Sequence, residues 1–333
     1  MILGVAIDED LRRAFFTEAQ WAHLVSLADV RILPSPAELL DPANLPVLAQ
    51  IEGLMTGWGC PPLTSEILDA CPELTVVVHT GGSVRSFVSD EVFARGIRVS
   101  SQTELNAEPV AQYCLAQILL AAKGVGRATR EYASTKAMTT FDDVWADGIG
   151  VYGARIGLIG YGRVARRLIE MLRGFSVTVL LNSPYVSEEC ARNLGVELVG
   201  LEEIMSTSDV ISVHLGDTPD NHGAITGELL SLVKHGATFI NTARGIVVDE
   251  IALIRELRTG RFDAVLDVTY PEVPSPDSEL WTLPNVTLTP HWAGSLGREL
   301  TLLGQGAITN VEEYLRGAPL TGQIDPALAA YIA

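Results

Sequence analysis

The sequence predicts an α/β protein made of two doubly wound parallel sheets. Three observations support this fold class. Short apolar runs alternate with helical patterns over residues 1–100, the alternation resumes at residue 155, and a glycine-rich turn follows the first strand of the second series. Such alternation is typical of parallel strands covered by helices on both faces. We therefore expect two domains, residues 1–103 plus 297–333 and residues 104–296, with a cleft between them.

The bulk composition is that of a packed chain and excludes several classes of partner. The 333 residues are 47% hydrophobic and 19% charged, which allows two ordinary domains and does not indicate disorder. A formal net charge of −18 argues against a nucleic-acid surface and against binding to anionic membranes. The longest apolar stretch, residues 110–122, contains two glutamines and is too short to span a bilayer.

The cysteines give no sign of a metal or a disulfide framework. They are Cys60, Cys71, Cys114 and Cys190. Because they form no CxxC pair and no metal-like spacing, we predict no metal site. Isolated thiols usually lie in cores. The sequence shows no secretory signal, so we expect a reducing, cytoplasmic environment.

The first series contains five candidate strands separated by helical segments. Residues 64–71 are an example of these segments, with either Thr64 or Ser65 as the N-cap. The predicted strands of this series are residues 2–7, 30–33, 51–57, 74–80 and 97–101.

A long helix and an arm-like segment lead into the second series. The helix is predicted over residues 107–124, with Pro109 near its first turn and Gly124 at its end. Residues 125–150 are polar and irregular. A last helix, residues 302–317, is expected to cross back onto the first unit. The predicted strands of the second series are residues 155–160, 177–181, 209–215, 237–242, 263–268 and 285–290.

The second series opens with a turn that predicts binding of a dinucleotide. Gly160, Gly162 and Ala165 follow the GxGxxA spacing between an apolar strand and an amphipathic helix. The first glycine permits a tight turn, the second lets a pyrophosphate approach the backbone, and a small third residue lets helix and strand pack closely. Amides at the start of the helix would then face the phosphates.

Charged and titratable side chains follow the ends of three strands of the second series. Arg244, Glu272 and His291 each come shortly after a different predicted strand, and Asp267 lies at the end of its own strand. Ligands of open α/β sheets bind outside the carboxyl ends of the strands, so we expect these side chains at one edge. Any one of them alone would be read as a surface or core residue, but together they indicate a catalytic site.

The segments that carry these side chains resemble a known family. FINTARGIVVDEIALIREL, LDVTYPEVP and LTPHWAGS are similar to signature segments of the D-isomer-specific 2-hydroxyacid dehydrogenases. The resemblance implies a flavodoxin-like substrate domain, residues 1–103 plus 297–333, and a Rossmann cofactor domain, residues 104–296. It also implies hydride transfer between a nicotinamide cofactor and a small acid such as glyoxylate, hydroxypyruvate or pyruvate. The long helix and the arm imply a homodimer.

The same motif match implies a role for each strand-end residue. Arg244 would bind the substrate carboxylate and keto oxygen through a planar, permanently charged fork. His291 would be the general acid/base, with Glu272 on its other ring nitrogen. Trp292 would line the substrate pocket. The residues implied to contact the cofactor are Gly160, Gly162, Arg163, Val164, Ser183, His214, Thr242, Ala243 and Asp267, of which Asp267 would hold the nicotinamide carboxamide.

Two histidines and one loop leave alternatives open. Residues 79–85, HTGGSVR, follow a strand and offer successive backbone amides, which can bind a carboxylate. The matching family segment binds substrate, so the resemblance makes candidates of Gly82, Ser83 and Val84, and an ordinary Gly-Gly turn is the alternative. His79 either lines the pocket or is structural. His214 matches a family histidine beside the cofactor, and we interpret it as structural.

The choice between NAD and NADP depends on residue 183. Family members that use NAD often carry an acid where this chain has Ser183, after Asn182. A missing carboxylate removes both an acceptor for the ribose hydroxyls and the repulsion that excludes a 2′-phosphate. No basic residue follows, and Glu188 and Glu189 come next, so we expect weak discrimination with a slight preference for NAD. Arg163 is the nearest candidate cation.

Two further functions remain open at this level. A family dehydrogenase for another substrate, such as formate, is disfavoured by Glu272, because those enzymes use an amide beside the histidine. A nucleotide-sensing interaction protein of corepressor type would keep the same fold, and an intact arginine–glutamate–histidine set does not exclude it. A relative that has lost activity is the third reading, and nothing in the sequence supports it.

Overall fold

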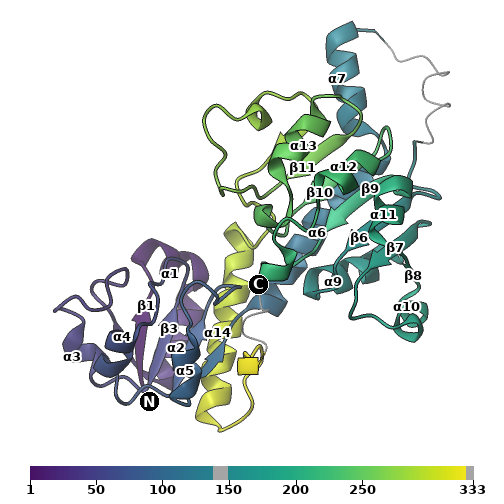
Figure 1. Ribbon diagram of the computed structural model, residues 1–333. Coiled ribbons are helices and arrows are strands. Elements are labelled where there is room, and N and C mark those ends of the chain that lie inside the picture. Colours follow the sequence, from purple (N-terminus) through teal and green to yellow (C-terminus); the bar gives the residue numbers. More distant parts are fainter. Residues whose placement is uncertain (138–148, 328–333) are drawn as a thin grey trace. The chain divides into compact units, whose positions relative to one another are not determined.

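The computed structural model describes residues 1–137 and 149–327 (Figure 1). The chain divides into two compact units, Met1–Asn106 with Ser295–Ala333 and Ala107–Gly294. Each unit is built on one parallel β-sheet, five strands in the first and seven in the second. This confirms the predicted fold class.

The first unit has the strand order β2-β1-β3-β4-β5, with every neighbouring pair parallel. This is the flavodoxin order 2-1-3-4-5. Four of its strands are fully or largely buried because helices cover both faces. The strands are β1 (Ile2–Ala6), β2 (Asp29–Ile32), β3 (Gly53–Thr56), β4 (Val76–His79) and β5 (Arg98–Ser100).

Helix α14 (Leu300–Leu315) completes the core of the first unit, although it comes from the other end of the chain. Leu303, Ala307 and Val311 are fully buried in one cluster with strand residues Leu3 and Val76. Figure 1 shows α14 in yellow beside this sheet. The other helices of the unit are α1 (Glu9–Phe15), α2 (Glu18–Leu27), α3 (Leu45–Leu48), α4 (Ser65–Ala70) and α5 (Asp90–Ala94).

The second unit has the strand order β12-β11-β10-β9-β6-β7-β8, again all parallel. If β6 is counted as the first strand, the six strands β8-β7-β6-β9-β10-β11 follow the Rossmann order 3-2-1-4-5-6. Strand β12 extends the sheet beyond β11. The two-residue β8 was not predicted. The strands are β6 (Arg155–Ile159), β7 (Thr178–Asn182), β8 (Glu197–Leu198), β9 (Val210–Val213), β10 (Thr238–Asn241), β11 (Asp263–Leu266) and β12 (Val286–Leu288).

Two predictions about the connecting helices were wrong. Helix α6 (Thr103–Ala122) begins four residues earlier than residue 107, so Pro109 lies inside the helix rather than in its first turn. A proline there removes one helical hydrogen bond, and the surrounding helix tolerates the loss. Residues 125–135 of the supposed irregular arm form helix α7 (Val125–Thr135), which has no buried residue. Residues 138–148 of that arm lie outside the described residues.

Five further helices cover the second sheet. They are α9 (Arg163–Leu172), α10 (Glu188–Leu194), α11 (Leu201–Thr207), α12 (Gly227–Leu232) and α13 (Glu250–Leu257). Single turns of 3-10 helix lie at Pro219–Asn221, Gly245–Val247, Glu279–Trp281 and Gly297–Glu299. Among the described residues, none of the helices has the length and apolar character needed to cross a membrane.

The packing of α14 on α1 depends on a glycine. A Cβ at Gly304 would lie 2.0 Å from the backbone oxygen of Phe15. Gly304→Ala should therefore destabilise the first unit by about 1–3 kcal/mol, because backbone must move to make room. Thermal unfolding followed by circular dichroism measures this as a lower Tm. Gly200→Ala is the control, since nothing lies within 4 Å of its Cβ position. An unchanged Tm for Gly304→Ala would contradict the contact.

Candidate active site

The glycine turn between β6 and α9 is shaped by three different constraints. Gly160 has φ +96°, and a Cβ there would lie 2.6 Å from the backbone oxygen of His214. Gly162 is the N-cap of α9, and its Cβ position faces open space, with nothing within 4 Å. Ala165 is fully buried. Gly160 and Ala165 must therefore be small because of their neighbours. Gly162 has no such neighbour, and its missing side chain leaves the space in front of the helix start open.

The start of α9 fits a dinucleotide phosphate. Within the part of the chain that the structure describes, the amides of Gly162, Val164 and Ala165 donate to no acceptor outside the helix. A helix start also carries a partial positive charge. The open space above Gly162 and these amides are what a pyrophosphate would need. Arg163, the first helical residue, lies at the same place.

The end of β7 carries no acid. Asn182 is the last residue of the strand, and its Nδ2 donates to the backbone oxygen of Val199 at 2.9 Å. Ser183 follows, and its Oγ accepts from the amide of Tyr185 at 3.3 Å. Glu188 and Glu189 form the first turn of α10 a few residues later. The local charge after β7 is therefore negative, although residue 183 itself is neutral.

Asn241, the last residue of β10, shapes the turn that presents Arg244. Its Oδ1 accepts from the amide of Ala243 at 3.0 Å, and its Nδ2 donates to the backbone oxygen of Arg244 at 2.9 Å. The Nη1 atom of Arg244 donates to the backbone oxygen of Ala243 at 2.6 Å. Asn241 was not among the predicted site residues, although an asparagine that starts a turn is a recognised signal. Thr242 instead turns its hydroxyl to Cys114 Sγ at 3.1 Å.

His291 and Glu272 form a hydrogen-bonded pair outside neighbouring strands. Nδ1 of His291 lies 2.6 Å from Oε1 of Glu272, and the two side chains are 50% and 57% exposed. Glu272 follows β11 and His291 follows β12, which pair in parallel. Because Nδ1 faces the carboxylate, Nε2 is the ring nitrogen left for another partner. The sequence prediction that these two residues meet is supported by this geometry.

Asp267 holds the turn that carries His291. Its Oδ1 accepts from Thr289 Oγ1 at 2.5 Å and from the amide of Trp292 at 2.6 Å, and its Oδ2 accepts from the amide of Ala293 at 3.0 Å. The backbone oxygen of Asp267 accepts from the amide of His291 at 2.9 Å. His291 has φ +55°, which is uncommon for a side chain of this size. The buried carboxylate is thus committed to this turn, a role the sequence did not show.

The Glu272 loop is held from two further sides. A Cβ at Gly245 would lie 2.0 Å from the backbone carbon of Thr269, so the Arg244 turn rests directly on this loop. Thr269 Oγ1 donates to the backbone oxygens of Pro271 at 2.8 Å and Glu272 at 3.0 Å. Glu250, at the start of α13, accepts from the amide of Tyr270 at 3.0 Å. These contacts fix the Glu272 loop relative to Arg244.

The loop after β4 in the first unit presents unused amides. Two of its backbone carbonyls are hydrogen-bonded at the start of α6. The amide of Gln102 donates to the oxygen of Gly81 at 2.8 Å, and Thr103 Oγ1 donates to the oxygen of Gly82 at 3.0 Å. The amides of Gly82, Ser83 and Val84 have no acceptor among the described residues. The side chain of Val84 is buried in the core, so only its backbone is available.

Two histidines are held in the neutral form by burial. His79 is 2% exposed, its Nδ1 lies 2.9 Å from Thr56 Oγ1, and its ring packs on Phe87 at 4.8 Å. Burial lowers the pKa of His79 to about 3. Burial also lowers the pKa of His214 to about 4. Neither is suited to exchange protons near neutral pH, which supports structural roles for both.

The fold and the glycine turn define a class, the dinucleotide-binding α/β proteins. Comparison with known proteins gives the family. A family model described as "D-isomer specific 2-hydroxyacid dehydrogenase, NAD binding domain" matches residues 115–293. D-3-phosphoglycerate dehydrogenase of Mycobacterium leprae (strain TN) is 33% identical over 267 residues, 79% of this chain and 48% of that protein. Glyoxylate reductase of Korarchaeum cryptofilum (strain OPF8) is 30% identical over 257 residues, 77% of each.

Solved structures agree with this assignment. A protein from Thermus thermophilus aligns with TM-score 0.77 and 26% identity, covering 98% of this chain and 100% of that one. The apo form of D-mandelate dehydrogenase from Rhodotorula graminis aligns with TM-score 0.80 over 97% of both chains, and its 22% identity shows the fold alone. The chain belongs to the D-isomer-specific 2-hydroxyacid dehydrogenase family, as the sequence predicted. It spans about half the length of the phosphoglycerate dehydrogenases that it matches.

The position of Glu250 makes stability depend on pH. Burial raises the pKa of Glu250 above its ordinary value. The folded state therefore binds this proton more tightly than the unfolded state, and that contribution is present at low pH and lost as the pH rises through the folded-state pKa. Glu250→Gln has no proton to lose and keeps an oxygen for the Tyr270 amide. Its stability relative to wild type should rise as the pH increases from about 4, near the ordinary pKa of a glutamate, towards neutrality.

Chemical denaturation of both proteins across that pH range measures the difference. The exposed Glu228→Gln, in the first turn of α12, is the control and should show no such trend. A relative stability of Glu250→Gln that stays flat or falls with pH would contradict the burial of this carboxyl group.

Proposed function

We propose that the chain is an NAD(P)-dependent oxidoreductase that interconverts a small 2-keto acid and its 2-hydroxy acid. The observation that carries this proposal is the hydrogen bond between His291 and Glu272. The pair lies at the same edge of the sheet as Arg244, and the chain belongs to a family of 2-hydroxyacid dehydrogenases. A base oriented by a carboxylate, beside a guanidinium that can hold a carboxylate, is the arrangement that proton transfer at a hydroxy acid requires.

His291 is proposed to move the proton. Its Nε2 would donate a proton to the keto oxygen in the reductive direction and accept it from the hydroxyl in the oxidative direction. Glu272, 2.6 Å from Nδ1, would stabilise the imidazolium and hold the ring in one orientation. Asp267 would act on this step indirectly, because it fixes the backbone turn of His291.

Arg244 is proposed to position the substrate. A guanidinium can form two parallel hydrogen bonds with a carboxylate, and in a partly enclosed site it also polarises the adjacent keto oxygen. The amides of Gly82, Ser83 and Val84 are proposed to bind the same carboxylate, and Trp292 to contact the remainder of the substrate. The acceptor-free amides of this loop support that role. Glyoxylate, hydroxypyruvate and pyruvate are the small acids that we expect to fit.

The nicotinamide cofactor is proposed to bind along the carboxyl edge of the second sheet. Gly160, Gly162, Arg163 and Val164 would hold its pyrophosphate, and Ser183 would face the adenosine ribose. Thr242, Ala243, His214 and Asp267 are the proposed neighbours of the nicotinamide half, and the hydroxyl of Thr242 already contacts Cys114. When bound, the cofactor supplies or accepts the hydride. A homodimer in the cytoplasm remains part of the proposal.

One screen tests the activity as a whole. Oxidation of NADH and of NADPH is followed by absorbance against a panel of 2-keto acids that includes glyoxylate, hydroxypyruvate, pyruvate and 3-phosphohydroxypyruvate. Turnover on a small unphosphorylated acid would support the proposal, whereas turnover on the phosphorylated acid alone would contradict the proposed substrate. No turnover on any of them, with partner proteins retained in pull-downs, would favour a corepressor-like protein.

Arg244→Ala should reduce kcat/KM on the best substrate by about 10² to 10⁴. Two charge-assisted hydrogen bonds contribute about 1.5–3 kcal/mol each, and about 1.36 kcal/mol corresponds to a factor of ten. Steady-state kinetics measure the change. Arg13→Ala is the control, because Arg13 is exposed on α1 of the other unit. A near-normal kcat/KM for Arg244→Ala would show that the role assigned to this residue is wrong.

Ser183→Asp should shift the cofactor preference firmly towards NADH. A carboxylate at the end of β7 would accept from the ribose hydroxyls and repel a 2′-phosphate. The ratio of kcat/KM for NADH to that for NADPH measures the effect, and Ser183→Asn, which adds no charge, is the control. For the unmodified protein we expect weak discrimination with a slight preference for NADH, because Glu188 and Glu189 oppose the extra phosphate. A more than hundredfold preference for NADPH would overturn this.

A further inference from the structure

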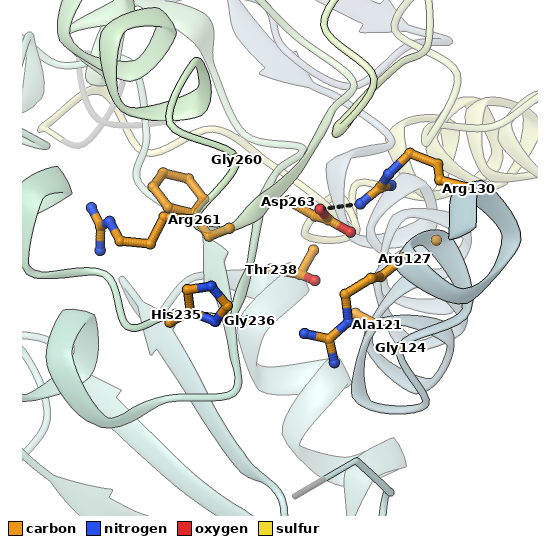
Figure 2. Close-up of a pocket in the computed structure, with 12 residues that line it drawn as sticks. Ala121, Gly124, Arg127, Arg130, His235, Gly236, Thr238, Gly260, Arg261 and Asp263 are labelled. Carbon is orange, nitrogen blue, oxygen red and sulfur yellow. Dashed lines mark hydrogen bonds and ion pairs between the residues drawn. The ribbon is translucent and has the colours of Figure 1, made fainter. Parts of the chain in front are cut away.

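Helix α6 runs along the second sheet from one edge of the strands to the other. Ala121, near the end of the helix, lines a cavity together with Thr238 and Asp263, the first residues of β10 and β11 (Figure 2). Arg130 of α7 reaches the same place, where its Nη2 contacts Asp263 Oδ1 at 2.6 Å. The end of α6 therefore lies at the amino-terminal edge of these strands, opposite the edge that carries the proposed catalytic residues.

The middle of α6 reaches the catalytic edge. Tyr113 comes eight residues before Ala121, and at about 1.5 Å per residue these span about 12 Å, close to the length of a four-residue strand. Cys114 is fully buried, and its Sγ lies 3.1 Å from Oγ1 of Thr242, the residue after β10. The phenol oxygen of Tyr113 lies 3.0 Å from Oγ1 of Thr289, the residue after β12. Two consecutive residues of α6 thus contact two different turns of the site.

Thr289 fixes the start of the turn that carries His291. Its hydroxyl donates to Asp267 Oδ1 at 2.5 Å, and its backbone oxygen accepts from the amide of His291 at 3.0 Å. Its own amide donates to the oxygen of Leu266, the last residue of β11, at 3.0 Å. Because Asp267 also accepts from the amides of the two residues after His291, Thr289 is joined to this turn through its side chain as well as its backbone.

The hydrogen-bond inventory makes Tyr113 the donor to Thr289. A threonine hydroxyl has one proton, and Thr289 gives it to the Asp267 carboxylate, which can only accept. The bond between the two hydroxyls therefore has the phenol of Tyr113 as its donor. Burial raises the pKa of Tyr113 above its ordinary value, and the charge of Asp267 adds to the rise. The phenol thus keeps its proton near neutral pH and remains a donor.

We propose that Tyr113 is a positioning residue for the acid/base step at His291. Its hydroxyl holds Thr289 in the orientation that donates to Asp267, and Asp267 holds the turn of His291. A hydroxyl that accepts a hydrogen bond is polarised by it and donates more strongly to the next group in the chain. In this role Tyr113 acts through Thr289 and Asp267 and does not contact the substrate. The inference rests on the proposed function of His291.

Tyr113→Phe removes the hydroxyl and keeps the ring, so it tests this chain with little change in packing. Steady-state kinetics on the best 2-keto acid should show kcat lowered about threefold to tenfold, the loss expected for one net hydrogen bond. KM for the acid should stay within about twofold of wild type, because the lost contact acts on proton transfer and not on substrate binding. Tyr152→Phe, at an exposed position, is the control and should change neither constant. A raised KM with an unchanged kcat would overturn the proposal.

A double variant separates positioning from packing. Thr289→Val removes the middle hydroxyl and should lower kcat at least as much as Tyr113→Phe does. Adding Tyr113→Phe to Thr289→Val should then lower kcat by less than about 1.5-fold more, because Tyr113 has no path left to His291. Thr289→Ser keeps the hydroxyl and should retain most of kcat. Losses that multiply in the double variant, or an equal loss in Thr289→Ser and Thr289→Val, would contradict the proposed chain.

A measurement without substrate keeps this inference separate from the proposed function. The chain has six histidines, so the imidazole resonances of His291 can be assigned by their loss in His291→Gln. They should shift in Tyr113→Phe and in Thr289→Val, and stay in place in Tyr152→Phe, whether or not any keto acid is turned over. Shifted resonances without turnover would support the link from Tyr113 to His291 and contradict the proposed activity. Resonances of His291 that do not move in Tyr113→Phe would overturn the inference itself.

Discussion

The buried carboxylate of Asp267 is the contact on which the arrangement of the site depends. It accepts from the hydroxyl of Thr289 and from the amides of Trp292 and Ala293, while its backbone oxygen accepts from the amide of His291. Together these bonds hold His291 at φ +55°, a conformation that a histidine seldom adopts without support. A buried charge in turn needs donors around it. The turn and the carboxylate therefore stabilise each other, and the His291–Glu272 pair follows from that.

Parallel strands explain why these groups share an edge at all. In a parallel sheet every strand ends on the same side, so residues far apart in the sequence become neighbours after their strands. Asn241, Asp267 and Thr289 each follow or end a strand of the second sheet, and each organises the turn that leaves it. Gly245 then lets the Arg244 turn rest on Thr269 without a gap. The opposite edge of β10 and β11 receives a different set of charges, from α7 and the loop before β10.

The strands and the glycine turn were predictable because they depend on local patterns. Eleven predicted strands correspond to strands of the two sheets, with ends that differ by at most two residues. The strand β8 was missed because two residues have no periodicity. Helix α6 starts before Pro109, and α7 forms within a segment read as irregular. The latter helix has no buried residue, and its polar composition made the segment look irregular.

The sequence by itself determined the two α/β units, the GxGxxA turn and the family, because periodicity and motif spacing are properties of short segments. The tertiary structure decided what depends on distant residues. Examples are the commitment of Asp267 to the His291 turn, the burial that keeps His79 and His214 neutral, and the acceptor-free amides after β4. It also brought two arginines of α7 to the start of β10 and β11. The physical reason is that burial, hydrogen-bond partners and cavities arise only when segments separated by many residues pack together.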